Sequence, residues 1–268
     1  KGRENVLIDF QYSEGERPIV AQIFGSKPEQ FMKAATLIRK LGFDGIDINA
    51  GCPDRSVCKQ GAGAALIEDP ERTKEIIEAT KEGGGGLPVS IKTRTGYNKD
   101  ITEEWIKALL ETDLTAITLH ARTKKEMSDV PANWDAVRCA VEVRNESGKD
   151  ILILGNGDID SLEDAHKKIK ETGCDGAMVG RGIFGNPWFF TGKKREEIDV
   201  EARLQAMCEH AETFEELFKE KKNFSIMKKH FKAYVSDFKE SKELRIKLME
   251  AESAKEVREI VENFLQSW

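Results

Sequence analysis

Several features are absent from this 268-residue sequence or scarce in it, and each absence excludes a class of protein. No apolar run approaches the roughly 18 residues that a membrane span needs, and the polar first residues predict no signal peptide. Five cysteines are scattered without a CxxC pair, which argues against a zinc site or a disulfide framework. The net charge of −6 gives no overall sign of a nucleic-acid partner. We therefore expect a globular, cytoplasmic, monomeric protein that binds neither a metal nor a membrane.

What the sequence does contain is a repeated succession of strand, polar turn and helix. Short apolar runs, each followed by polar or glycine-rich residues, cover residues 19–24, 45–49, 88–92, 116–120, 151–154 and 176–179. Apolar residues at helical spacing predict helices between them, over residues 28–41, 71–81, 102–111, 134–144 and 161–172. The four glycines at 83–86 predict a flexible loop. This alternation is typical of an α/β fold with a parallel sheet covered on both faces.

The number of predicted strands leaves two architectures open. About six strands are predicted, whereas a (β/α)8 barrel closes with eight. The fold is therefore either an open sheet or a barrel of which roughly two N-terminal βα units lie before residue 1.

The pattern changes at about residue 196, where strand signals stop. Only helical spacing remains, over residues 202–218, 224–238, 244–249 and 257–265. We predict a barrel-type domain at 1–195 and a small all-helical domain at 196–268. Lysines gather in the second domain, among them Lys219, Lys228 and Lys232. Such a run is often an ordinary solvated face, but on one small domain of an acidic protein it also fits a contact with RNA.

The stretch from Asp47 to Pro53 is the most informative turn. It carries Asn49 and Cys52 directly after a buried strand, and Gly51 and Pro53 prevent the strand or a helix from continuing. Parallel α/β proteins build their sites at the carboxyl ends of strands. Cys52 is therefore either a small buried residue, as free cysteines usually are, or a chemical group at such a site.

Other strands end in polar groups of a similar kind. The side chains expected at the same face have a partly cationic character and include neither paired acids nor a His/Asp metal cluster: Gln22, Lys92, Arg94, His120, Arg122, Asn156, Asp158 and Arg181. The glycine turns at 155–158 and 180–182 are typical of phosphate-binding turns after the last strands of a barrel. Together with Lys92 and His120, they predict a phosphate-bearing cofactor.

These motifs, in this order and spacing, resemble the tRNA-dihydrouridine synthase family, in particular its bacterial B-type members. The stretches that carry the resemblance are 21–25, 47–53, 61–66, 91–94, 120–123, 155–159 and 180–188. The resemblance implies a (β/α)8 barrel followed by a helical tRNA-binding domain. It implies reduction of specific uridines in tRNA to 5,6-dihydrouridine, with FMN as cofactor and NADPH as reductant. Hydride would reach C6 of the uracil, and a proton would reach C5.

The resemblance also implies a role for each matching residue. Cys52 would be the general acid, and a thiol with its ordinary pKa of about 8.5 is mostly protonated near neutral pH. FMN would be bound by Gln22, Lys92, His120, Asn156, Gly157, Asp158, Gly180 and Arg181. The tRNA substrate would be bound by Asn49, Arg94, Arg122, Lys228 and Lys232.

Two other functions stay open at this point. One is a different FMN barrel oxidoreductase that acts on a free pyrimidine, like a dihydroorotate dehydrogenase. Such an enzyme would not need a lysine-rich helical domain. The other is a non-catalytic RNA-binding protein built on a decayed barrel, against which the presence of Cys52, Lys92, His120 and Arg181 argues.

Overall fold

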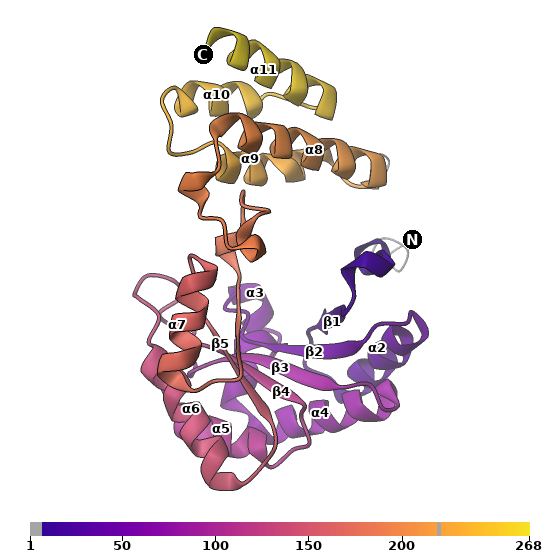
Figure 1. Ribbon diagram of the computed structural model, residues 1–268. Helices are drawn as coiled ribbons and strands as arrows, with labels where there is room; N and C mark the ends of the chain where they lie inside the picture. Colours follow the sequence, from indigo (N-terminus) through magenta and orange to yellow (C-terminus); the bar gives the residue numbers. More distant parts are fainter. Residues whose placement is uncertain (1–6, 219–220) are drawn as a thin grey trace. The chain divides into compact units, whose positions relative to one another are not determined.

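The computed structural model describes residues 7–218 and 221–268, which form two compact units (Figure 1). The sheet unit comprises Phe10–Ile159 and Asp164–Val179, and the helical unit is mainly Gly180–Trp268. Residues 180–195 therefore pack with the C-terminal helices, whereas the sequence predicted them as part of the first domain. The assignment of the two domains to cofactor binding and tRNA binding stays a prediction.

The sheet unit contains six parallel strands that are hydrogen-bonded in the order of the sequence. They are β1 (Val20–Ile23), β2 (Gly45–Ala50), β3 (Val89–Arg94), β4 (Ala116–His120), β5 (Leu152–Asn156) and β6 (Gly176–Met178). All six lie where the apolar runs predicted them. A sequential order of parallel strands alternating with helices is that of consecutive units of a (β/α)8 barrel, so the predicted fold class is confirmed.

Helices follow the strands in turn, and the longer ones, without the single turn α3, lie along one side of the sheet (Figure 1). They are α2 (Pro28–Lys40), α3 (Arg55–Cys58), α4 (Pro70–Gly84), α5 (Thr102–Leu110), α6 (Trp134–Ser147) and α7 (Leu162–Thr172). The prediction of a loop at 83–86 was wrong in its first half, because Gly83 and Gly84 belong to α4. A Cβ on Gly83 would lie 2.2 Å from the carbonyl oxygen of Met32, so this glycine is needed for close packing of α4 on α2.

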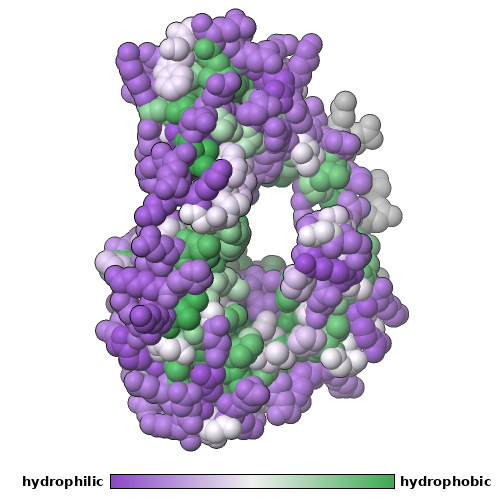
Figure 2. All heavy atoms as spheres, viewed as in Figure 1, coloured by the Kyte–Doolittle hydropathy of each residue, from purple (hydrophilic) through white to green (hydrophobic). Residues whose placement is uncertain are grey.

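The two faces of the sheet have different surroundings. Isoleucines that face the helices are completely buried, among them Ile48, Ile91, Ile117 and Ile153. The other face lines a cavity of about 490 Å³ whose walls include Gln22, Asp47, Ser90, Thr118 and Met178. In the space-filling view most of the visible surface is hydrophilic, with hydrophobic atoms exposed within the sheet unit (Figure 2). Alternation along each strand thus sends one set of side chains to the core and the other to the cavity.

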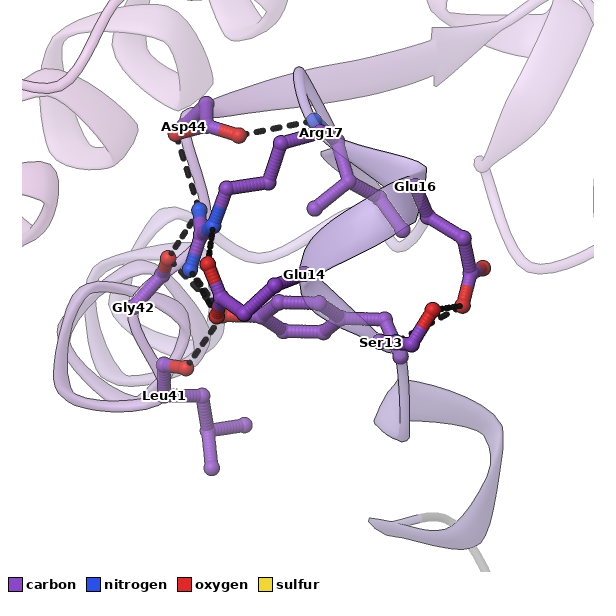
Figure 3. Close-up of polar contacts among 9 residues, drawn as sticks. Ser13, Glu14, Glu16, Arg17, Leu41, Gly42 and Asp44 are labelled. Carbon is purple, nitrogen blue, oxygen red and sulfur yellow. Dashed lines mark hydrogen bonds and ion pairs between the residues drawn. The ribbon is translucent and has the colours of Figure 1, made fainter.

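Arg17 fixes the segment before β1 against the turn before β2 (Figure 3). Its guanidinium donates to the carbonyl oxygen of Gly42 and to Asp44, each at 2.9 Å, and to the hydroxyl of Tyr12 at 2.8 Å. Asp44 also accepts from the amide of Ile19 at 2.8 Å. Asp44 therefore aligns β1 with β2, and this alignment places Gln22 opposite Asp47.

Among its described residues, the helical unit contains four α-helices around a core of its own. They are α8 (Val200–Phe218), α9 (Lys228–Tyr234), α10 (Ser241–Leu248) and α11 (Ala254–Ser267). Leu204, Met207, Phe231, Leu248 and Val257 are buried together between them. No helix among residues 7–218 and 221–268 is long and apolar enough to cross a membrane.

Candidate active site

The strand register brings the predicted polar residues to one edge of the sheet. Asn49 on β2 is the partner of Lys92 on β3, and Arg94 is the partner of His120 on β4. His120 in turn is the partner of Asn156 on β5. Arg94, His120 and Asn156 end their strands, and Asn49 and Lys92 lie one and two positions before the ends of theirs, so all five lie at the carboxyl edge, where α/β barrels carry their sites.

A hydrogen-bond network joins β1 and β2 at this edge. The Gln22 side chain donates to Asp47 at 2.7 Å and accepts from Asn49 at 2.9 Å. Ser90 donates to the other oxygen of Asp47 at 2.6 Å. Burial raises the pKa of Asp47, while the hydrogen bonds from Ser90 and Gln22 and the charge of Lys92 oppose this effect. The sequence prediction missed Asp47, although its position two residues before Asn49 placed it on the same face of the strand.

The Cys52 turn, residues 49–53, is held by Asn49. The side-chain oxygen of Asn49 accepts from the amides of Gly51 at 3.1 Å and Cys52 at 2.8 Å. The carbonyl oxygen of Cys52 accepts from the amide of Ala64 at 3.0 Å. Gly63 lies so close that a Cβ there would be 2.8 Å from this oxygen. Both the amide and the carbonyl of Cys52 are therefore hydrogen-bonded. The fixed main chain limits the positions that its half-buried side chain can take.

Arg94 is almost completely buried, with 5% of its surface exposed. Its Nε donates to the carbonyl oxygen of Gly51 at 2.8 Å, and its Nη1 donates to those of Thr123 and Met127 at 3.0 and 3.1 Å. Burial lowers the pKa of Arg94 and the nearby charge of Arg122 lowers it further, while the negative charge of Glu126 opposes the shift.

The side chain of Lys92, on β3, forms a hydrogen bond with Asn156 at the end of β5. Its Nζ donates to the side-chain oxygen of Asn156 at 3.1 Å, and the amide nitrogen of Asn156 donates to the carbonyl oxygen of Met178 at 2.8 Å. Burial, with the positive charge of Arg94, lowers the pKa of Lys92 to about 8, although Asp47 opposes the shift. Lys92 is therefore mostly protonated at pH 7 but much closer to losing its proton than an ordinary lysine.

His120 stays neutral in this setting. Burial and the positive charges of Arg94, Lys92 and Arg122 lower its pKa to about 3. Nη1 of Arg122 lies 3.3 Å from Nε2 of His120. Because a guanidinium can only donate, this contact requires an unprotonated Nε2, and the neutral ring carries its proton on Nδ1. His120 can thus donate one hydrogen bond from Nδ1 toward a bound group.

The turn after β5 is held by Arg122 and Trp134. Asp158, at a positive φ of 48°, pairs with Arg122 and accepts from the amide of Ala132 at 2.9 Å. Trp134 donates to the carbonyl oxygen of Gly157 at 3.0 Å. Gly157 has a φ of 126°, and a Cβ there would lie 2.9 Å from Ala132, so only glycine fits. Arg122, predicted to bind the substrate, is 3% exposed and holds this turn.

The remaining predicted residues belong to the helical unit. Gly180 and Arg181, expected at the cofactor phosphate, are part of that unit, so their grouping with Asn156 and Gly157 stays a prediction. Lys228 and Lys232 lie one turn apart on α9, and Lys232 is exposed. Lys228 lines a polar groove of about 620 Å³ with Lys222, Asn223, Phe224 and Ser225 among others. Lys219 lies outside the described residues. Within those residues, no group of three or more His, Cys, Asp or Glu side chains could hold a metal.

A parallel sheet with a polar, cationic carboxyl edge defines the chain as a barrel-type α/β protein with a site at the strand ends. Comparison with known proteins identifies the family. The sequence model of the family described as "Dihydrouridine synthase (Dus)" matches residues 2–268, and the chain belongs to this family. It is an enzyme of the oxidoreductase class.

Curated relatives agree with this assignment. A Staphylococcus aureus (strain COL) protein named "Probable tRNA-dihydrouridine synthase" is 40% identical over 98% of this chain and 80% of its own length. "Probable tRNA-dihydrouridine synthase 2" of Bacillus subtilis (strain 168) is 38% identical over 98% of this chain and 81% of its own length. Among solved structures, morphinone reductase in complex with tetrahydroNAD has a TM-score of 0.44 at 19% identity, covering 61% of this chain and 47% of that chain.

Proposed function

We propose that the protein reduces specific uridines of tRNA to 5,6-dihydrouridine, with FMN as cofactor and NADPH as reductant. Membership of the dihydrouridine synthase family, and the names of relatives that cover nearly the whole chain, support the reaction and the substrate. The single observation that supports the mechanism is the Cys52 turn. It places a half-buried thiol at the same strand edge as Asn49, Lys92 and His120.

The residues at this edge fit a flavin. Gln22 also lines the cavity of about 490 Å³ on the inner face of the sheet, whereas Lys92, His120 and Asn156 do not, so the fit depends on the donors at the strand edge and not on this cavity. Lys92 uses one of its three N–H groups on Asn156, and His120 has an Nδ1–H to donate. Gln22, Lys92 and His120 would hold the ring system. Asn156, Gly157, Asp158, Gly180 and Arg181 would hold the phosphate end.

Within that arrangement each residue has a definite task. Bound FMN, once reduced, would supply the hydride that C6 of the uracil needs. Cys52 would give its proton to C5 and become a thiolate that solvent reprotonates. Lys92, protonated at pH 7, would place positive charge beside the ring. Asn49 and Arg94 would contact the target base, and Arg122 would support this side of the site.

The helical unit would bind the tRNA. A base must leave its stack to reach a buried site, at a cost of a few kcal/mol, and contacts between lysines and phosphates can offset that cost. Lys228 and Lys232 would supply such contacts. The cytoplasmic location and the monomeric state stay predictions.

The test is to compare Cys52→Ala with wild type and with Cys139→Ala, which removes a half-buried thiol from α6. FMN content is read from the visible spectrum, tRNA binding from a gel shift, and dihydrouridine from mass spectrometry of digested tRNA. We expect Cys52→Ala to bind FMN and tRNA. Its rate of dihydrouridine formation should be lower than that of wild type by at least about 100-fold. The Cys139→Ala variant should resemble wild type.

Two results would contradict the proposal at different levels. Wild-type turnover in Cys52→Ala would remove Cys52 as the acid but leave the reaction in place. A wild-type protein that binds FMN, reduces a free pyrimidine and leaves tRNA unchanged would instead support the alternative oxidoreductase. A protein that binds tRNA but no flavin would support the non-catalytic reading.

A further inference from the structure

The turn that carries Cys52 depends on a side chain from the neighbouring strand. Asn49 satisfies the two amides of the turn, and Ala64 satisfies the carbonyl of Cys52. The carbonyl of Gly51, directly before Cys52, is bound by Nε of Arg94 at 2.8 Å. Arg94 is 43 residues away in sequence and joins this turn to β3, as does Thr93, whose hydroxyl donates to the carbonyl oxygen of Ala50 at 3.1 Å.

The same guanidinium also binds the segment after β4. Its Nη1 donates to the carbonyl oxygens of Thr123 and Met127. Met127 has a φ of 53°, a left-handed conformation that costs a residue with a side chain of the order of 1 kcal/mol or more. Arg94 therefore connects the Cys52 turn to a loop whose backbone is strained at the point of contact.

Stability alone does not account for a buried arginine here. Within residues 7–218 and 221–268, Arg94 forms no ion pair; its hydrogen bonds go to three carbonyl oxygens, and the charge of Glu126 is nearby but not in contact. A buried charge without an ionic partner is costly, and apolar residues of similar volume are often more stable in such places. The planar guanidinium of Arg94 donates to both loops at once. Neither an apolar residue nor a lysine would reproduce this geometry.

We propose that Arg94 is a positioning residue that sets the location of the Cys52 thiol for proton donation, by fixing the Gly51 carbonyl to the loop after β4. This inference rests on the proposed function for the role of Cys52, and it concerns a task distinct from the contact with the target base that the sequence predicted. Nη2 of Arg94 makes no hydrogen bond within the described residues, so the same side chain retains a donor for that contact.

The variant that tests the proposal is Arg94→Lys, which keeps the charge but cannot bind the two loops as a fork. Arg144→Lys is the matched control. Arg144 is also largely buried and donates to a carbonyl, that of Ile151 at 2.9 Å, but at the opposite end of β5. Full-length proteins are compared in a single turnover, in which the prereduced enzyme is mixed with excess tRNA and flavin oxidation is followed.

We expect Arg94→Lys to lower the single-turnover rate at saturating tRNA by about 100-fold, since a displacement of about 1 Å can have that effect. Its reduction by NADPH, which precedes tRNA binding in this assay, should be within about twofold of wild type. In a Cys52→Ala background the same substitution should cause little further loss, because both changes remove one step. The positioning role would be overturned if Arg94→Lys had the same single-turnover rate as Arg144→Lys. It would also be overturned if Arg94→Lys lowered the rate by the same factor in the wild-type and Cys52→Ala proteins.

Hydrogen exchange separates failure of this proposal from failure of the proposed function, because it needs neither tRNA nor turnover. Arg94→Lys should speed amide exchange in residues 49–58 and 121–130 and leave 28–40 unchanged. Unchanged exchange in 49–58 would show that Arg94 does not hold the turn. If wild type does not reduce tRNA, the reaction fails as proposed, while the exchange data still decide whether Arg94 fixes the Cys52 turn.

Discussion

Replacing Lys92 with methionine should make the sheet unit more stable at neutral pH, although it removes a predicted cofactor contact. The pKa of Lys92 is lowered from its ordinary value of 10.5 to about 8, first by burial and then by Arg94. A fall of that size means that folding disfavours the charged form by about 3 kcal/mol. Loss of the hydrogen bond to Asn156 lowers the free energy of unfolding by about 1 kcal/mol. The net expectation is a gain of about 2 kcal/mol at pH 7.

The pH dependence gives a sharper test than a single stability. Below pH 8 Lys92 is protonated in both the folded and the unfolded wild type, so the full cost of burying its charge, about 3 kcal/mol, destabilises the folded protein. Between pH 8 and 10.5 the folded protein has released the proton while the unfolded chain still binds it, so wild-type stability rises with pH across this window. The Lys92→Met variant lacks this contribution, and its advantage over wild type should therefore disappear as the pH approaches 10.5.

The assay is equilibrium urea unfolding of flavin-free protein at pH 7, 8, 9 and 10, followed by circular dichroism. Lys40→Met, which removes an exposed charge at the end of α2, is the control and should give a pH profile parallel to that of wild type. A Lys92→Met protein that is less stable than wild type at pH 7 would refute the reasoning. So would a difference from wild type that is the same at pH 7 and pH 10.

Three further expectations follow from single contacts. Gly63→Ala should cost about 1–3 kcal/mol and slow the reaction, because a Cβ would meet a carbonyl at 2.8 Å and φ is +60°; Gly86→Ala, also at positive φ but with open space, should affect stability alone. Lys228→Ala combined with Lys232→Ala should weaken tRNA binding and reduce its logarithmic salt slope by about 1.5, and an unchanged slope would exclude this face. His120, with a pKa of about 3, should give the NMR spectrum of a neutral ring protonated on Nδ1 at pH 5, and an imidazolium spectrum there would contradict the assigned state.

The sequence predicted the strands well because buried parallel strands are short apolar runs with little ambiguity. The prediction at residues 45–49, for example, differs from β2 by one residue. It was less successful where a residue acts through distant contacts. A loop was predicted at 83–86 because of its glycines. Gly83 is in fact a helix residue whose lack of a side chain leaves room for the carbonyl of Met32, about 50 residues away in sequence.

The candidate site shows the same division. Residue types and their order along the chain identified the edge of the sheet and the Cys52 turn. They did not reveal that Arg94 is engaged with Gly51, Thr123 and Met127, because periodicity contains no information on which carbonyl a buried guanidinium will reach. Asp47 was overlooked although strand alternation places it on the face of Asn49; the register of β1 and β3 adds which side chains it meets there, Gln22 and Ser90.

That register also determines which changes of length the chain can tolerate. Asn49, Lys92, His120 and Asn156 face one side only because their strands pair without a slip. Inserting or deleting one residue within a strand would turn every following side chain of that strand toward the helices. Natural or laboratory variants that differ in length should therefore collect their insertions in the loops between helices and strands. A library built from this chain would remain active only if it conserves the number of residues in each strand.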